Sequence, residues 1–383
     1  MIPGNMIKLI RAVTVSQSIG FFEAMIPDLQ SKGYEVISLS SPGAEIQKLR
    51  QKGVKCIELP MKRRISLSKD IVSLWKLIKV FRKEQPDMIH SMTPKAGLLC
   101  MVAAKICRVP VRIHTFTGLV WPTATGLKRK ILMATDWITC ICATHIIPEG
   151  EGVKNDLLSH GITHKHLKVL GYGNVRGIDL KHFDRSSEVM REAEKIAVKD
   201  SFTFIFVGRI VRDKGINELV AAFTKLQRKY SNIRLVLVGQ FEDSLDPISC
   251  ETKKEIKCNE HIVAVGVQKD VRPWLVSADA LVFPSYREGF PNVVIEAGAM
   301  GLPSIVTNIN GSREIIQDGV NGIIVPSQDE DVLYKAMEKF VTDQPFVSML
   351  ASHAREMIAT RFEQGFVKQC LLDFYNDVKE KAL

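Results

Sequence analysis

Two glutamates eight residues apart, Glu288 and Glu296, stand on either side of a Gly-Phe-Pro turn. A buried strand is expected to end shortly before Glu288, and a helix is expected to begin after the turn. Glu296 then lies about two turns into that helix, so the two carboxylates cannot act on one bond as the acid pair of a hydrolase does. We expect each carboxylate to accept hydrogen bonds from hydroxyl groups on separate parts of one extended ligand.

The residues between these glutamates are suited to binding an anion. Pro291 stands where the first residue of a helix is expected, and the amides of a first helical turn have no partner inside the helix. The pattern predicts an anion site at the amides of Asn292, Val293 and Val294.

A second charged turn lies upstream, where Gly-Arg-x4-Lys-Gly occupies residues 208–215. It follows an apolar run and leads directly into a helical pattern, so Arg209 and Lys214 are expected at the mouth of a strand-to-helix turn. Two cations there suit a diphosphate, and Gly215 would let the backbone approach it. A charged loop with a glycine turn is the alternative interpretation of this segment taken alone.

Short β-rich runs that alternate with helical patterns position these turns. Such alternation is typical of βαβ units around parallel sheets, whose ligands bind beyond the carboxyl ends of the strands. One hydrophobic core serves roughly 250 to 300 residues at most, and this chain has 383. We therefore predict an α/β protein with two doubly wound domains, residues 1–175 and 176–361. The predicted strands are 7–15, 34–39, 55–59, 88–90, 111–115 and 145–147, then 202–207, 233–238, 262–265, 280–283, 304–306 and 322–325.

Charge is divided unevenly between the halves. Residues 1–172 contain 25 Lys and Arg against 12 Asp and Glu, whereas the remainder contains 27 against 30. The basic half is expected to meet a partner of its own, or to be a solvated basic surface. A nucleic acid is not the expected partner, because no helix-turn-helix, RNA-recognition or zinc-finger pattern accompanies the charge.

The eight cysteines have no disulfide or metal-site spacing, which is typical of a reducing compartment. No stretch has the pattern of a signal peptide or of a membrane span. We expect a cytoplasmic location, which argues against a periplasmic two-lobed binding protein.

Four motifs together resemble the retaining glycosyltransferases of family 4, which have the GT-B fold. They are Gly-Arg-x4-Lys-Gly at 208–215, Glu-x7-Glu at 288–296, Gly-Ser-Arg-Glu at 311–314 and Asp-Gly-x-Asn-Gly at 318–322. The resemblance implies two Rossmann-like domains that face each other across a cleft. It also implies a C-terminal helix, 362–383, that returns to the first domain.

The resemblance assigns roles around a nucleotide-sugar. Arg209 and Lys214 would hold the diphosphate and stabilise the departing nucleotide, Glu288 would contact the sugar, and Glu296 the ribose. The donor-binding residues implied are Gly20, Gly208, Arg209, Lys214, Val265, Gly266, Glu288, Gly289, Phe290, Pro291, Asn292, Val293, Val294 and Glu296.

The catalytic residues that the resemblance implies are His114, Glu288, Arg209 and Lys214. His114 stands where a strand is expected to end, and the family carries a histidine at such a strand end. A loop over 18–20 would face the phosphates. The Asp-x-Asp motif of the other glycosyltransferase fold is missing, so no metal and no cofactor are expected.

The acceptor binds the first domain in this fold, so the basic surplus is expected to face it. One cationic cluster, Lys62, Arg63 and Arg64, precedes a helical pattern over 67–83 that contains Trp75; another comprises Lys128, Arg129 and Lys130. The apolar stripe of 67–83 either belongs to the core or lies at lipid headgroups. These features favour an anionic membrane surface and a lipid-linked saccharide as partners.

The sequence therefore predicts a retaining hexosyltransferase, peripheral at the inner face of the plasma membrane. It would move a hexose or N-acetylhexosamine from a nucleotide-sugar, by default UDP-linked, to a polyprenyl-diphosphate-linked sugar for capsule or O-antigen. The alternatives are a GT-B nucleotide-sugar epimerase and, more remotely, a basic nucleic-acid-binding protein.

Overall fold

The computed structural model describes residues 6–62, 66–243 and 246–382, and it divides into two compact units. The first unit comprises Met1–Gly177 and Gly365–Leu383, and the second comprises Ile178–Gln364. The domain boundaries predicted from the sequence fall within three residues of these limits.

The first unit is built on a six-stranded parallel sheet with the order β3-β2-β1-β4-β5-β6. Its strands are β1 (Ile7–Ala12), β2 (Tyr34–Ser40), β3 (Lys55–Glu58), β4 (Met88–Met92), β5 (Val111–Phe116) and β6 (His145–Pro148). Most of their residues are buried, because the faces of a parallel sheet are covered by its crossover helices.

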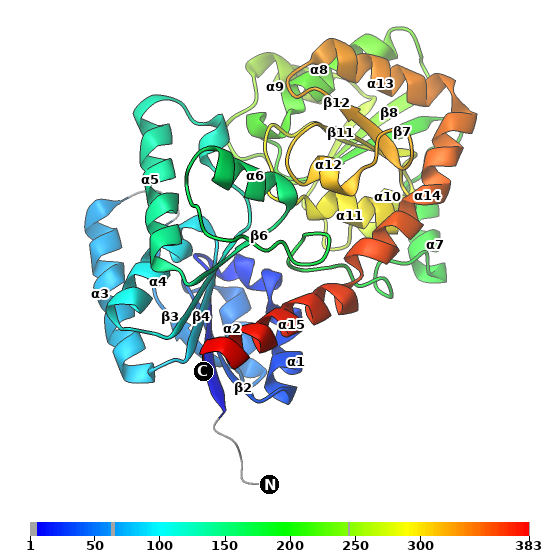
Figure 1. Ribbon diagram of the computed structural model, residues 1–383. Helices are drawn as coiled ribbons and strands as arrows, with labels where there is room; N and C mark the ends of the chain where they lie inside the picture. Colours follow the sequence, from blue (N-terminus) through cyan, green and yellow to red (C-terminus); the bar gives the residue numbers. More distant parts are fainter. Residues whose placement is uncertain (1–5, 63–65, 244–245, 383) are drawn as a thin grey trace. The chain divides into compact units, whose positions relative to one another are not determined.

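The two faces of this sheet hold separate hydrophobic clusters. Leu9 and Val13 join one cluster with residues of α1, α2 and the C-terminal helix α15, whereas Ile10 and Ala12 join the other with residues of α3 and α4 (Figure 1). Helix α15 thus packs on the first unit, as the resemblance implied. The helices of this unit are α1 (Ile26–Ser31), α2 (Ala44–Gln51), α3 (Leu67–Glu84), α4 (Pro94–Ile106), α5 (Gly126–Cys142), α6 (Glu151–Ser159) and α15 (Gln364–Ala382).

The second unit has a parallel six-stranded sheet of its own, with the order β12-β11-β10-β7-β8-β9. Its strands are β7 (Phe202–Val207), β8 (Ile233–Val238), β9 (Ile262–Gly266), β10 (Ala280–Phe283), β11 (Ser304–Thr307) and β12 (Gly322–Val325). Its helices are α7 (Ser187–Ile196), α8 (Ile216–Gln227), α9 (Cys250–Cys258), α10 (Arg272–Val276), α11 (Asn292–Ala299), α12 (Ser312–Ile315), α13 (Glu330–Thr342) and α14 (Gln344–Phe362).

The order of the second sheet decides where its site lies. Strand β7, the first of the unit, pairs with both β8 and β10, so the chain leaves it toward one side of the sheet and returns on the other. The carboxyl ends of β7 and β10 therefore mark the switch point at which doubly wound sheets bind ligands. Both charged turns predicted from the sequence follow these two strands.

Candidate donor-binding site

An ion pair joins the two charged turns of the second unit. The Lys214 ammonium, at the end of the turn that follows β7, contacts Oε1 of Glu288 in the loop that follows β10. Their side chains are only 16% and 17% exposed, so water screens the pair weakly. The residues are 74 positions apart in the chain, and the adjacency of β7 and β10 brings them together.

Buried Ser285 holds the Glu288 carboxylate in place. Its Oγ lies 2.8 Å from Glu288 Oε1, and its own backbone carbonyl accepts a hydrogen bond from the Thr307 hydroxyl. One oxygen of Glu288 thus faces both an ammonium and a hydroxyl. A carboxylate fixed in this way is a directed hydrogen-bond acceptor.

Two further contacts, which we call the Asp213 clamp, tie the two turns to each other. The Tyr286 amide donates to the Asp213 carbonyl at 2.8 Å, and Arg287 Nη2 lies 2.9 Å from Asp213 Oδ2. The Tyr286 hydroxyl donates to Glu218 of α8 at 2.6 Å. The sequence analysis assigned no role to these residues, although Asp213 and Arg287 each adjoin a predicted site residue.

Two glycines allow the backbone segments of the site to touch. A Cβ at Gly215, whose φ is +71°, would lie 2.1 Å from the carbonyl oxygen of Pro284. A Cβ at Gly311, before α12, would lie 2.4 Å from the carbonyl oxygen of Gly289. The expectation for Gly215 was an approach to phosphate, whereas the approach seen is between the β7 turn and the β10 loop.

Arg209 has an acidic partner that the sequence analysis did not identify. Its guanidinium lies 2.5 Å from Glu242, in the segment that follows β8, and its side chain remains 44% exposed. Because Glu242 also follows the carboxyl end of a strand, the rule that located the other turns could have found it.

The start of α11 differs slightly from the expectation. Pro291 is the N-cap residue and the helix begins at Asn292, one position later than predicted. The Val294 amide donates to the Pro291 carbonyl at 3.1 Å, so it is already engaged within this turn. The loop before it is anchored by Phe290, which is buried with its ring 5.4 Å from that of Phe362.

The remaining predicted donor residues lie at the end of β9, directly after β7 or further along α11. Val265 and Gly266 end the edge strand β9, where the Val265 carbonyl accepts from the Gln268 side chain at 2.7 Å and the Gly266 carbonyl accepts from the Gly239 amide at 2.9 Å. Gly208 directly follows β7, and Glu296 is partly buried in the second turn of α11.

His114 lies elsewhere than the sequence analysis expected. It stands inside β5, two residues before the strand ends, and its side chain is buried against Gly97 of α4. Its Nδ1 lies 2.9 Å from Ser91 Oγ, and burial lowers the pKa of the imidazole to about 3. The residue that actually follows the end of β5 is Thr117.

Gly20 is also placed differently. The predicted loop over 18–20 belongs to a 3-10 helix, η1 (Ser16–Phe21), and a Cβ at Gly20 would meet no atom within 4 Å. The position therefore does not need a glycine on steric grounds.

The apolar stripe of α3 is divided between core and surface. Leu77, Ile78 and Phe81 are buried, whereas Trp75 is 60% exposed. Lys62, Lys128 and Lys130 are exposed, and Arg129 lies with its guanidinium 5.8 Å from the buried Trp121 ring. Arg63 and Arg64 lie outside the described residues.

Among the residues described, no helix is long and apolar enough to cross a bilayer, and no three His, Cys, Asp or Glu side chains gather at metal-ligand distance.

Both units of the protein match known protein families. Residues 188–357 match the family described as glycosyl transferases group 1, and residues 21–173 match the glycosyl transferase 4-like domain. The capsular polysaccharide biosynthesis glycosyltransferase CapM of Staphylococcus aureus is 33% identical over 96% of this chain and 97% of its own length. This chain belongs to the group 1 glycosyltransferases.

Two further relatives bear on this glycosyltransferase. The UDP-Gal:alpha-D-GlcNAc-diphosphoundecaprenol alpha-1,3-galactosyltransferase of Escherichia coli is 27% identical over 82% of each chain. The crystal structure of Anabaena HepE in complex with UDP-glucose superposes with a TM-score of 0.80, at 17% identity, over 97% of this chain and 99% of that one. The latter likeness shows the GT-B fold, as predicted from the motifs.

Proposed function

We propose that this glycosyltransferase moves a hexose or N-acetylhexosamine, with retention of configuration, from a UDP-sugar to a polyprenyl-diphosphate-linked saccharide. The reaction would serve the synthesis of a surface polysaccharide. The observation that carries the donor half of the proposal is the Lys214–Glu288 pair at the switch point of the second sheet. The names of the relatives support the rest, since one acts on a diphosphoundecaprenol-linked sugar and another has been crystallised with UDP-glucose.

The charges of the site suit a departing nucleoside diphosphate. Lys214 and Arg209 would face the diphosphate and stabilise the charge that develops as the glycosidic bond breaks, so the proposal requires no metal or cofactor. Glu288 would accept a hydrogen bond from a sugar hydroxyl, and Glu296 from the ribose. The Asp213 clamp would keep Lys214 and Glu288 in register while the donor binds.

Retention would follow from a same-face transfer. The departing phosphate oxygen would take the proton of the acceptor hydroxyl as that hydroxyl attacks the anomeric carbon from the side of the leaving group. Lys214 already holds the Glu288 carboxylate, and the role proposed for Glu288 is orientation of the donor. The scheme assigns no proton transfer to His114, because its side chain is buried and its Nδ1 lies 2.9 Å from Ser91 Oγ.

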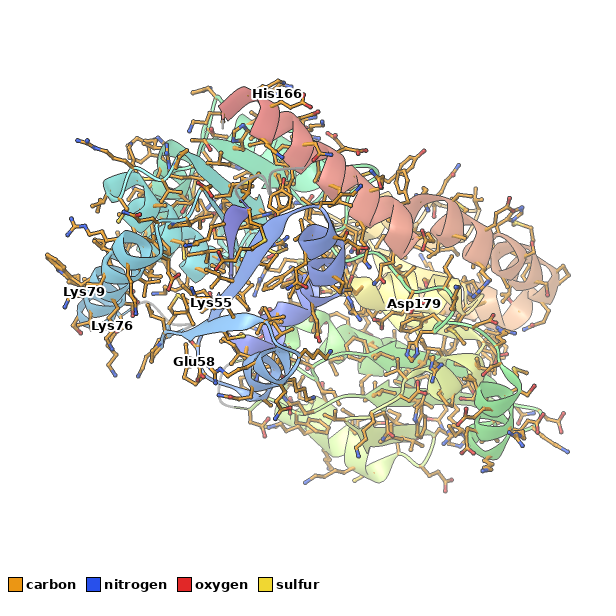
Figure 2. The ribbon with its side chains drawn as sticks, turned by 90° about the horizontal axis from the view of Figure 1, so that it is seen from below. Lys55, Glu58, Lys76, Lys79, His166 and Asp179 are labelled. Atoms are coloured by element: carbon orange, nitrogen blue, oxygen red, sulfur yellow. The ribbon has the colours of Figure 1, made fainter. Side chains whose placement is uncertain are left out.

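The acceptor would reach the first unit from a membrane surface. Apolar side chains of α3 and α5 are exposed beside cations, and both helices pack against α4 on the same face of the sheet. Figure 2 shows Lys76 and Lys79 on α3 extending away from the ribbon. We call this the α3–α5 surface; its exposed apolar members are Leu67, Ile71, Val72, Trp75, Leu127, Ile131, Trp137, Ile138 and Ile141.

Such a surface suits anionic lipid headgroups, since apolar side chains enter the interface while lysines meet the phosphates. The enzyme would therefore be peripheral at the cytoplasmic face of the plasma membrane. Replacing both Trp75 and Trp137 by serine should reduce co-sedimentation with phosphatidylglycerol vesicles about tenfold. Equal sedimentation of the variant and the wild type would contradict the assignment.

The function is tested by turnover of a panel of UDP- and GDP-sugars with and without a polyprenyl-diphosphate-linked saccharide. Sugar transfer to the lipid, with the anomeric configuration of the donor kept in the NMR spectrum of the product, is the expected result. An isomerised or free sugar formed equally well without lipid would instead favour the epimerase alternative. An inverted product would overturn the retaining assignment alone.

A further inference from the structure

A basic groove lies in the first unit, formed by the edge strand β6, the segment after α6 and the end of α15. It has a volume of about 720 Å³, within the range of ligand sites. His145 is the first residue of β6, so the groove lies at the end of the sheet opposite to the carboxyl ends of its strands. Its lining residues are Thr144, His145, Ile146, Lys165, His166, Lys168, Phe374, Asp377, Val378 and Lys381.

The charges of this basic groove are not balanced. Lys165, Lys168 and Lys381 line it together with one carboxylate, Asp377, which is 3.5 Å from the Lys168 ammonium. Both members of that pair are more than half exposed, so the contact contributes little. A groove of about 390 Å³ in the second unit is lined by Glu255 and Glu260 and by no lysine or arginine, so the two grooves differ in charge.

Lys165, one of the lining residues, is held in place by two backbone carbonyls. Its ammonium donates to the carbonyls of Cys140 and Ala143, at 2.7 and 2.5 Å, and so caps the end of α5. An ammonium has three donors, and these two bonds leave one for a ligand. A cation held by the fold is preorganised for an anion, because binding does not have to order it.

The imidazole of His145 reports the positive potential. Its pKa is lowered by burial first, and then by the charges of Lys165, Lys381 and Arg112. Its ring lies edge-on to the buried Phe374, 5.9 Å away between centroids, and the Lys168 ammonium lies 5.9 Å from the centroid of the same phenyl ring. Figure 2 shows His166 beside the C-terminal end of α15, and His166 is one of the residues that line the groove.

From this geometry we infer that the basic groove binds a phosphate-type oxyanion with two or more negative charges. Lysine ammonium groups act as point charges for phosphate oxygens, and the groove supplies three of them, from Lys165, Lys168 and Lys381. Neither Glu288 nor Lys214 belongs to this groove, so the inference does not depend on the proposed function. The anion can come from solution or from a lipid headgroup.

The test follows the imidazole resonances of His145 and His166 in histidine-labelled enzyme, assigned with His145→Gln and His166→Gln. Inorganic pyrophosphate and phosphatidylglycerol vesicles form separate arms. A bound anion should shift both resonances and raise the pKa of His145, since it offsets the neighbouring cations. Because the readout is local to the groove, anions that bind at Lys214 do not affect it.

The matched variants are Lys168→Ala/Lys381→Ala and Lys254→Ala/Lys257→Ala, the latter pair being exposed lysines of α9. Each removes two charges, but only the first should weaken the response, about tenfold. A response to pyrophosphate assigns the site to a free oxyanion, and a response to vesicles alone assigns it to a headgroup. Unchanged histidine resonances in both arms, or equal loss in the two double variants, would overturn the inference.

Discussion

The two units have the same strand order but hold several of their ionisable groups differently. In each sheet the first strand lies between the second and the fourth strand of its unit. The second unit pairs its charges beyond the strand ends, as Lys214 with Glu288, Arg209 with Glu242 and Arg287 with Asp213.

The first unit contains ion pairs too, such as Lys95 with Asp70, but it also buries single ionisable groups inside its layers, beside neutral partners. Arg11 donates to the Tyr375 hydroxyl at 3.0 Å, the same hydroxyl lies 2.5 Å from His90 Nδ1, and the Trp121 indole donates to Asp136 at 3.1 Å. Burial is the largest cause of each pKa shift, and it lowers the pKa of Arg11 and His90 and raises that of Asp136 to about 7. Paired charges beyond a strand end can meet a ligand, whereas groups buried inside the layers are withheld from one. The strand order itself does not distinguish the two.

The largest effect is expected on the reaction rate, from loss of the Lys214–Glu288 ion pair in the second unit. Lys214→Ala should lower kcat about a thousandfold, because it removes a cation facing the developing diphosphate charge. Lys225→Ala is the control, since that lysine lies on α8 of the same unit and forms an exposed ion pair with Asp331 of α13. Steady-state kinetics with the preferred donor would measure both. Comparable losses in the two variants would mean that the Lys214 pair is not part of the site.

The next largest effect is on the free energy of unfolding, which should depend on pH through the buried carboxyl of Asp136 in the first unit. The pKa of Asp136 is about 7 in the folded protein and near 3.8 when unfolded, so the folded state binds the extra proton between these values. Stability should therefore fall as pH rises from about 4 to about 7. Asp136→Asn should be more stable than wild type at pH 8 by about 3 kcal/mol and close to it at pH 4, in denaturant titrations. An advantage independent of pH would contradict this account.

A smaller loss of stability is expected when the close backbone approach between Gly215 and Pro284 in the second unit is disturbed. Gly215→Ala places a Cβ against Pro284 and should destabilise that unit by about 2 kcal/mol more than Gly266→Ala does. Gly266 is the matched control, because its φ is +70° while a Cβ there meets no atom within 4 Å. Hydrogen exchange resolved by peptide would show the loss in the second unit. Equal destabilisation would mean that φ alone, and not the close approach, governs Gly215.

The smallest effect should come from one hydroxyl in the first unit. Tyr375→Phe leaves Arg11 and His90 without their shared partner and should destabilise the packing of α15 by about 1.5 kcal/mol. Faster amide exchange in α15 would record it. Tyr172→Phe, at an exposed tyrosine of the same unit, should leave that exchange unchanged. Unaltered exchange after Tyr375→Phe would show that this buried network is dispensable.

Local sequence determined the elements of this protein. The predicted runs of β-branched and aromatic residues between turn signals form strands, because this pattern can be recognised within each segment alone. The order of the charged turns was also sufficient to predict the family. The spacing of the four motif residues is a property of the sequence and does not depend on packing; they are Arg209, Lys214, Glu288 and Glu296. Helix α5 lies between the strands predicted at 111–115 and 145–147, where the alternation of strands and helices predicts a helix.

Only the tertiary structure decided which residues meet. Pairing of β7 with β10 brings Glu288 to Lys214 across 74 residues, and packing of α4 on β5 buries His114, which the sequence analysis had placed at a strand end. It likewise exposes Trp75 while burying Leu77 on one helix. These outcomes depend on the neighbours that each side chain acquires from distant parts of the chain, and periodicity along a single segment does not contain that information.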